Sequence, residues 1–442
     1  MKENTLFIGL ADNSQLYIYK TQGLLKYADG QPDKISLPIA YTIEMANSHI
    51  PLKESIQTVS ERLSLSEEDE KHLLLGITQL CVEKKLLAST LPFPPKKNVI
   101  YEDDVFYPEC MHIELTKQCN FQCYYCYRES SMSASNEIIS GSKLLDIIKE
   151  LSLKGLKVVE ITGGEPLLHP DFEKIVLGCL QELTLVSVLT NGFFINEKFI
   201  DTVLPYKDKL VFSVSFDSWR DDDLDKRAGV HGAAPRIKKA IELISRKGFI
   251  VRATMAVDEN NWCDLEDTLL KAMEIGATRF AYSPIMPLGR APKESITWDS
   301  ISQKEAYAKE KYLAEKYRDF LDFTSENISK RIFSPGGCGA GHTNFVMSPN
   351  GSIRLCASYD ENVGIIGNVL KQPLREVFSH PLCKSSSQLK APSPTICGEC
   401  QYTSFCSGCS LRGTIGAEKI GHAQCKWIQQ KDATEWHKLL IK

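Results

Sequence analysis

The sequence has little net charge, no long apolar run and no export signal. The formal net charge is −4 over 442 residues, which gives no electrostatic reason to expect a nucleic-acid-binding surface. The richest apolar runs, such as residues 73–82, have about half of the ~20 residues that a membrane-spanning helix needs. The opening MKENTLFIGLADN lacks the apolar core of a secretory signal. We therefore expect a cytoplasmic protein with no nucleic-acid and no membrane partner.

Proline is also scarce, and the remaining composition is that of an ordinary folded protein. The chain is 43% hydrophobic and 24% charged with 20 prolines, which excludes wholesale disorder, collagen and coiled coil. At roughly 100–200 residues per domain, this length predicts about two to four domains.

Cysteine is the abundant exception, with 15 residues in the chain. In a long chain without an export signal, this number indicates metal or redox chemistry rather than a disulfide scaffold. Eight cysteines lie between Cys338 and Cys425, and three more lie within Cys119 to Cys126. We therefore expect two separate cysteine-rich sites.

The hydrophobic pattern divides the chain into three regions. Residues 1–95 change from alternating to helical periodicity, which predicts a β-hairpin followed by three short helices, and LPFPPKKN at 91–98 has the composition of a linker. Residues 108–325 predict consecutive βα units, with a polar helix ending near Lys330. Residues 331–442 are rich in Gly, Cys and turn residues, so their folding is expected to depend on bound metal.

The middle region predicts an α/β fold with a parallel sheet or partial barrel. Six short apolar strands are expected at MHIELT, KVVEIT, LVSVLT, LVFSVSF, FIVRATMAV and RFAYSPI. Catalytic groups should gather at the carboxyl ends of such strands, and the residues that interrupt the apolar pattern lie there.

A CxxxCxxC loop, written CNFQCYYC, follows the first of these strands. Thiolates of Cys119, Cys123 and Cys126 can bind three irons of a [4Fe-4S] cluster, which leaves the fourth iron open as a reaction site. A zinc knuckle is the competing interpretation, but it needs a fourth ligand, and the surroundings offer only His112 inside the strand.

Small and polar residues follow the next three strands. In TGGEP, paired glycines allow a close backbone approach and the Glu165 carboxylate can receive an ammonium group, although a Gly-Gly turn is also a common structural device. The ends of the next two strands carry small polar residues, which suit either contacts with a nucleoside or helix caps and turns. They are Thr190, Asn191, Gly192, Ser215 and Asp217.

Taken in order, CNFQCYYC, ITGGEP, VLTNG and SVSFDS resemble the radical S-adenosylmethionine (SAM) enzymes across residues 110–320. The resemblance implies a partial (β/α)6 barrel in which SAM chelates the open iron and is cleaved to a 5'-deoxyadenosyl radical that takes hydrogen from a substrate. It also implies the SAM-contacting residues: Gly163, Gly164 and Glu165 at the methionine end, Asn191 and Ser215 at the ribose, and the Tyr125 backbone at the adenine.

The C-terminal cysteines resemble a SPASM domain, which adds two auxiliary [4Fe-4S] clusters and makes three in all. The resemblance implies two ligand sets: Cys338, Cys356 and Cys409 for the first cluster, and Cys397, Cys400, Cys406 and Cys425 for the second. Seven cysteines leave one of eight iron positions without a cysteine. The two-residue spacing in CSGC departs from the usual three, and Cys383 is an alternative ligand. The remaining cysteines are expected to be packing residues: Cys81, Cys110, Cys179 and Cys263.

The N-terminal region resembles the winged-helix-like leader-recognition element of ribosomal-peptide maturation, which binds a leader as an added strand. A winged-helix DNA binder is the alternative, but the last helix lacks a basic cluster. The whole layout is similar to maturases that make thioether bridges of the sactipeptide or ranthipeptide type. This implies a ribosomal precursor peptide and a flavodoxin- or ferredoxin-type electron donor as partners.

Three other functions compete with thioether formation. Carbon–carbon crosslinking or epimerisation of a peptide uses the same architecture. An anaerobic sulfatase-maturing enzyme typically carries an Asp where this chain has Ala357. An iron–sulfur redox sensor on DNA would leave TGGEP unexplained. We identify no general base from the sequence.

Overall fold

The computed structural model describes residues 5–11, 14–19, 22–27, 32–47, 49–94, 98–102, 105–135, 137–291, 300–321 and 338–441. The chain forms two compact units. The first comprises Met1–Tyr107 with Glu150–Gly155, and the second comprises Pro108–Lys149 with Leu156–Lys442. The predicted end of the polar helix near Lys330 lies outside the described residues.

The first unit contains the predicted hairpin and three helices. Strands β1 (Phe7–Leu10), β2 (Gln15–Tyr19), β3 (Gly23–Lys26) and β4 (Asp33–Ile35) precede helices α1 (Leu37–Ala46), α2 (Leu52–Leu63) and α3 (Glu67–Val82). A capping box between Ser66 and Asp69 begins α3. Apolar side chains from the strands and all three helices, among them Ile18, Ile43 and Ile77, form one core.

Besides β1 and β4, two further strands of this unit were not predicted. Strand β5 (Leu86–Ser89) pairs with β1 in an antiparallel ladder, and β6 (Val99–Glu102) lies parallel to β2. The larger sheet therefore has the order β4-β3-β2-β6, and the unit continues to Tyr107. Both strands are short and pair with partners far away in the chain, so local alternation gave no signal for them.

The second unit contains all six predicted barrel strands. They are β7 (Cys110–Glu114), β8 (Val158–Thr162), β9 (Leu185–Thr190), β10 (Leu210–Ser215), β11 (Ile250–Val257) and β12 (Arg279–Pro284). They pair in parallel and in chain order, which confirms the predicted α/β fold with its large parallel sheet. The described helices between these strands are α4 (Gly141–Ser152), α5 (Phe172–Glu182), α6 (Glu197–Val203), α7 (Asp221–Ala228), α8 (Ala233–Arg246) and α9 (Leu265–Glu274), and α10 (Ser300–Lys316) follows β12.

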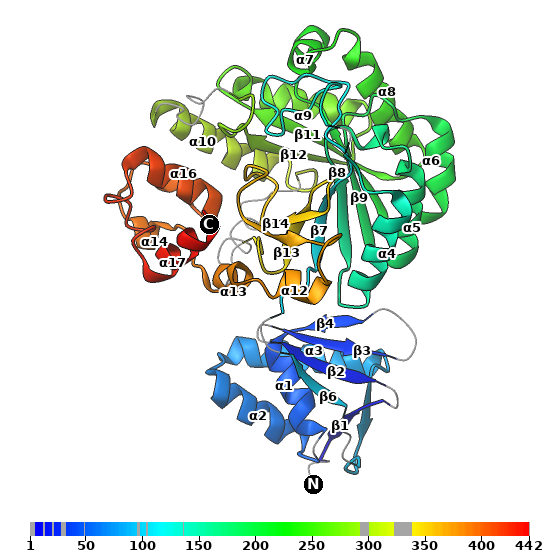
Figure 1. The fold of residues 1–442 in the computed structure, drawn as a ribbon, viewed down its shortest axis with the longest axis vertical. Helices are drawn as coiled ribbons and strands as arrows, with labels where there is room; N and C mark the ends of the chain where they lie inside the picture. Colours follow the sequence, from blue (N-terminus) through cyan, green and yellow to red (C-terminus); the bar gives the residue numbers. More distant parts are fainter. Residues whose placement is uncertain are drawn as a thin grey trace. The chain divides into compact units, whose positions relative to one another are not determined.

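The alternation of side chains gives each barrel strand one apolar and one more polar face. In β7, Met111 and Ile113 are buried, whereas His112 between them is partly exposed and contacts Glu160 of β8 at 2.7 Å. Helix α5 packs on β9, and α8 packs on β10 and β11, so the apolar faces are covered by helices (Figure 1).

The cysteine-rich region continues the barrel sheet. Strand β13 (Asn344–Met347) lies parallel to β7, and β14 (Ser352–Arg354) and β15 (Ile365–Asn368) follow in antiparallel order, which makes a nine-stranded sheet (Figure 1). The helices that follow are α12 (Leu374–Phe378), α13 (Pro381–Gln388), α14 (Pro394–Cys397), α15 (Thr403–Cys406), α16 (Ser410–Ile420) and α17 (Lys431–Leu440). In the part of the chain that the structure describes, none of the helices combines the length and the apolar character of a membrane span.

Candidate cofactor and cysteine sites

The three cysteines of the CxxxCxxC loop lie close together after the end of β7. Burial raises the pKa of Cys123 to about 12, and Asp217 and the thiols of Cys119 and Cys126 contribute to this shift. Burial likewise raises the pKa of Cys119 to about 11, again with a contribution from Cys126. Without a cation these thiols stay protonated, and a bound cluster would have to supply the positive charge that compensates buried thiolates.

The two glycines of TGGEP pack against the backbone that leads into this loop. The Gly164 amide donates to the Thr116 carbonyl at 2.7 Å. A Cβ on Gly164 would lie 2.2 Å from the Gln118 carbonyl oxygen, and one on Gly163 would lie 2.5 Å from that of Thr116. The glycines are therefore required for contact with the chain's own cysteine loop. Their contact with the methionine end of SAM stays a prediction.

Glu165 is fully buried and joins the ends of β8 and β9. Its carboxylate accepts hydrogen bonds from the Thr190 hydroxyl at 2.7 Å and from the Asn191 amide at 2.8 Å. Burial raises the pKa of Glu165 to about 7, and these hydrogen bonds act in the opposite direction. The carboxylate thus already has donors within the protein, and its predicted contact with a SAM ammonium group stays a prediction.

Asn191 lies directly beside the cysteine loop. Its Nδ2 donates to Asn120 Oδ1 at 2.9 Å and lies 3.9 Å from Cys119 Sγ. Its Oδ1 accepts from the Phe193 amide at 2.9 Å, which fixes the orientation of the side chain. The structure therefore brings the end of β9 together with the first cysteine of the loop.

Two further residues of the predicted nucleoside end, Ser215 and Asp217, lie at and just after the end of β10. The Tyr125 hydroxyl donates to the Asp217 carboxylate, and Asp217 also accepts from the Ala256 amide at 2.7 Å. Ser215 is the last residue of β10 and is partly buried. Asp217 therefore positions Tyr125 of the cysteine loop, in addition to any role toward a nucleoside.

A buried ion network, which sequence reasoning missed, connects the barrel with the cysteine-rich region. Arg128 donates through Nε and Nη2 to Glu114 Oε1 at 2.7 and 2.6 Å, and Arg354 Nη2 donates to Glu114 Oε2 at 2.6 Å. Arg354 is fully buried and also donates to the carbonyls of Cys356 and Tyr359, each at 3.2 Å. The only sequence signal was Glu114 in an otherwise apolar strand.

Arg290 is a second missed residue that holds the cysteine loop. Its Nε donates to the Cys123 carbonyl at 3.0 Å, and its Nη1 donates to the Ser130 carbonyl at 2.8 Å. The neighbouring Gly289 approaches so closely that a Cβ would lie 2.5 Å from the Cys126 carbonyl oxygen. The segment after β12 therefore packs on the loop that follows β7, although β12 and β7 lie five strands apart in the sheet.

The seven C-terminal cysteines form two groups. Burial is the main cause of the raised pKa of Cys356, and the neighbouring thiols of Cys409 and Cys338 raise it further. In the other group, burial raises the pKa of Cys406 to about 12, with contributions from Cys397, Cys425 and Cys400 and a smaller one from Cys409. These interactions are compatible with the two ligand sets that the family resemblance implied, and both the sets and their binding of iron stay predictions. Within the described residues, no set of three Cys, His, Asp or Glu side chains has the geometry of a single-ion site.

The other cysteines lie outside these groups. Cys383 is fully buried in α13, and burial is the main cause of its raised pKa. Cys179 is buried as expected, and Cys81 and Cys110 are partly buried. The expectation of a packing role is wrong for Cys263, which is exposed because it lies in the short 3-10 helix Trp262–Asp264 that joins β11 to α9.

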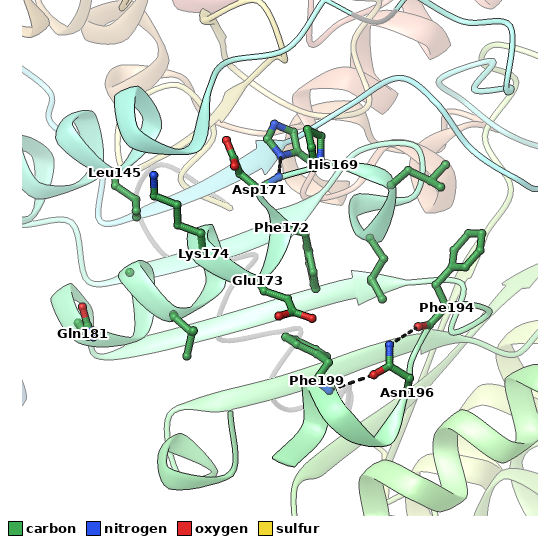
Figure 2. A pocket seen from close by; sticks show the side chains of 15 residues that line it. Leu145, His169, Asp171, Phe172, Glu173, Lys174, Gln181, Phe194, Asn196 and Phe199 are labelled. Carbon is green, nitrogen blue, oxygen red and sulfur yellow. Dashed lines mark hydrogen bonds between the residues drawn. The ribbon is translucent and has the colours of Figure 1, made fainter. Parts of the chain in front are cut away.

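A surface hollow of about 880 Å³ lies beside α5 and is separate from the predicted site (Figure 2). Its lining includes His169, Asp171, Phe172, Glu173 and Phe194. His169 Nδ1 accepts from the Asp171 amide at 3.0 Å, so this polar side chain is already engaged. None of the described residues that line the hollow is a predicted cofactor or metal residue.

Comparison with family models identifies both cysteine-containing regions. Residues 113–272 match the radical SAM superfamily, and residues 338–401 match SPASM, an iron–sulfur cluster-binding domain. The first range contains the CxxxCxxC loop and TGGEP, and the second begins at Cys338 and includes Cys356, Cys397 and Cys400.

Individual relatives cover most of the chain. The subtilosin biosynthesis protein AlbA of Bacillus subtilis is 28% identical over 334 residues, which are 74% of this chain and 72% of AlbA. An AdoMet-dependent heme synthase of Methanosarcina barkeri is 24% identical over 69% of this chain and 92% of its own length. The crystal structure of Streptococcus suis SuiB bound to the precursor peptide SuiA matches 97% of this chain and 100% of its own, with a TM-score of 0.61 and 14% identity. At that identity the structural likeness shows the fold alone.

Proposed function

We propose, from the premise that this chain is a radical SAM enzyme with a SPASM iron–sulfur domain, that it installs thioether crosslinks in a ribosomally synthesised precursor peptide. The observation that carries the proposal is the combination of a three-cysteine loop at the barrel with a second three-cysteine group, linked through Glu114 and Arg354. This chain is similar over most of its length to AlbA, a subtilosin biosynthesis protein, which supports a peptide as the substrate.

SAM and iron–sulfur clusters are the cofactors that these two domains imply. Cys119, Cys123 and Cys126 would hold the SAM-binding cluster, which fits the shared burial and proximity of their thiols. When bound, cluster and SAM supply the radical that takes a hydrogen atom from the peptide. Asn191 and Tyr125 would fix the loop and the nucleoside end, while Arg290 holds the loop backbone.

The auxiliary cysteine groups would hold the electron acceptor that thioether formation requires. Joining a thiol sulfur to a carbon removes a hydrogen atom and a proton from the peptide and releases one electron. An acceptor is therefore required, and the two cysteine groups provide sites for two auxiliary clusters, so that the enzyme would hold three in all. The first group has only Cys338, Cys356 and Cys409, which leaves one iron position for a cysteine thiolate of the substrate.

The first unit would bind the leader of the precursor. Its strands β4 and β6 are the outer strands of the larger sheet, where an extended peptide can add as a further strand. The crystal structure of SuiB with the precursor peptide SuiA bound supports this type of partner. We expect a flavodoxin or ferredoxin to supply electrons for SAM cleavage.

Anaerobic co-expression with the small peptide encoded beside the gene tests the proposal. Loss of a pair of hydrogens for each bridge, together with loss of alkylatable thiols, is the expected result in mass spectrometry. Hydrogen loss with every thiol still free would contradict thioether formation and indicate carbon–carbon bonds. An epimerised or unchanged peptide has no mass loss, and chiral amino-acid analysis separates these two outcomes.

A further inference from the structure

The first auxiliary cysteine group contains a buried hydroxyl group without a hydrogen-bond partner. Tyr359 lies three residues after Cys356, and its side chain is only 6% exposed. Its hydroxyl oxygen is buried and makes no hydrogen bond with any described residue. A buried hydroxyl that loses water without gaining a partner is destabilising, so such a group in a native protein calls for an explanation.

The hydroxyl lies beside a small cavity at the cysteine group. The cavity has a volume of about 20 Å³, and Cys338, Tyr359 and Ser410 contribute to its lining. The rest of its lining is formed by Ala340, Leu355, Ser386, Leu389 and Trp436. Ser386, also in the lining, already accepts a hydrogen bond from Trp436 Nε1 at 3.0 Å.

Tyr359 also interacts electrostatically with the other two cysteines of the group. Burial raises the pKa of Tyr359, and the thiolates of Cys356 and Cys409 raise it further, whereas the hydroxyls of Ser410 and Thr414 act in the opposite direction. The Thr414 hydroxyl donates to the Leu411 carbonyl at 2.7 Å.

The backbone of Tyr359 is held by the same network that reaches the barrel. Its carbonyl accepts from Arg354 Nη1 at 3.2 Å, and the same guanidinium binds Glu114. Its amide donates to the Cys356 carbonyl at 3.4 Å. The ring therefore extends from a fixed turn, and its position beside the thiols does not depend on a flexible loop.

We propose that Tyr359 belongs to the first auxiliary cluster site and donates its hydroxyl hydrogen to a sulfur of the bound cluster. Thiolate and bridging sulfurs carry negative charge and accept such hydrogen bonds. A hydrogen bond to sulfur stabilises the reduced, more negative cluster, so it raises the reduction potential. The proposal rests on the auxiliary cluster of the proposed function and is independent of which bond is made in the peptide.

The test compares Tyr359→Phe with the wild type and with Tyr206→Phe, using the reconstituted full-length chain; Tyr206 lies in the short 3-10 helix Leu204–Tyr206 of the barrel, outside the cysteine groups. In Tyr359→Phe we expect an unchanged iron content and a midpoint potential of one auxiliary cluster shifted to more negative values, measured by redox titration followed by electron paramagnetic resonance. Tyr206→Phe should leave this potential unchanged. An unshifted potential in Tyr359→Phe overturns the proposal, and loss of auxiliary iron overturns it by showing that the tyrosine is a ligand.

Thermal unfolding gives a second measurement that does not depend on activity. In the iron-free protein, Tyr359→Phe removes an unpaired hydroxyl and should not lower the melting temperature; in the reconstituted protein it removes a hydrogen bond and should lower it. Equal effects in both forms contradict the proposal. Peptide products are scored separately: a potential shift without any peptide modification supports the role of Tyr359 and contradicts the proposed function.

Discussion

Individual residues at the barrel mouth act mainly through the cysteine loop. Glu165 joins two strand ends, Asn191 contacts the loop, and Asp217 holds Tyr125. Residue types that sequence reasoning assigned to a cofactor therefore have structural partners as well. A substitution at these positions is expected to change cluster retention as well as SAM binding.

Gly164→Ala tests the close approach of TGGEP to the cysteine loop. The added Cβ would meet the backbone oxygen of Gln118, which has no flexible side chain to move aside. We expect a loss of about 1–3 kcal/mol in the free energy of unfolding and loss of the SAM-binding cluster. Denaturant unfolding and iron analysis measure both. Gly76→Ala, in α3, where the added Cβ would meet only the flexible end of the Ile39 side chain, is the control and should retain its iron. Full iron content in Gly164→Ala would refute this account of the turn.

Replacing Cys119, Cys123 and Cys126 together with Ala tests the assignment of the reaction site. We expect no cleavage of SAM to deoxyadenosine, because the open iron is lost, while iron in the C-terminal cysteine groups remains. Chromatography of the nucleoside products and iron analysis measure the two effects. Cys179→Ala, in the buried part of α5, is the control and should still cleave SAM. Deoxyadenosine formation by the triple variant would show that the site lies elsewhere.

Elements of the barrel and the cysteine-rich region are joined by strand pairing and by charge. Strand β13 lies against β7, and Glu114 at the end of β7 binds arginines from the cysteine loop and from β14. Because this ion network is almost completely buried, the two guanidinium groups depend on the carboxylate for compensation of their charge. The network therefore fixes the position of the cysteine loop relative to the turn at Cys356.

Glu114→Gln tests this connection. The amide keeps the shape of the side chain but removes the charge that compensates Arg128 and Arg354, and the expected loss in the free energy of unfolding is about 3–5 kcal/mol. Glu274→Gln, which removes an exposed ion pair with Lys271, should cost no more than about 1 kcal/mol. Equal losses in denaturant unfolding would contradict the importance of the network.

At the scale of the whole molecule, the chain is divided into two compact units. The first unit has outer strands that can accept an extended leader, and the second holds every predicted cofactor residue. In the proposed function, the first unit would bind the leader and the second would carry out the chemistry. Leader binding and SAM cleavage should therefore be separable by substitution.

Single N-methylation along a synthetic leader tests strand addition. Each methyl group removes one backbone donor, and only alternate amides of a strand face the sheet edge. We expect a weakening of binding by about tenfold at every second position, close to the net value of one hydrogen bond, measured by fluorescence anisotropy with the full-length chain. The unmethylated leader and the intervening positions serve as controls. Equal effects at all positions would contradict an added strand.

The sequence by itself determined the six barrel strands, the cysteine loop and the TGGEP turn, because periodicity and motifs are properties of consecutive residues. Only the tertiary structure decided which distant segments meet: β5 with β1, β6 with β2, and β13 with β7. It also brought Glu114 to Arg354, 240 positions away, and left Tyr359 with an unpaired hydroxyl among cysteines. Such contacts depend on long-range packing and on which partner satisfies each buried polar group, and no local pattern encodes them.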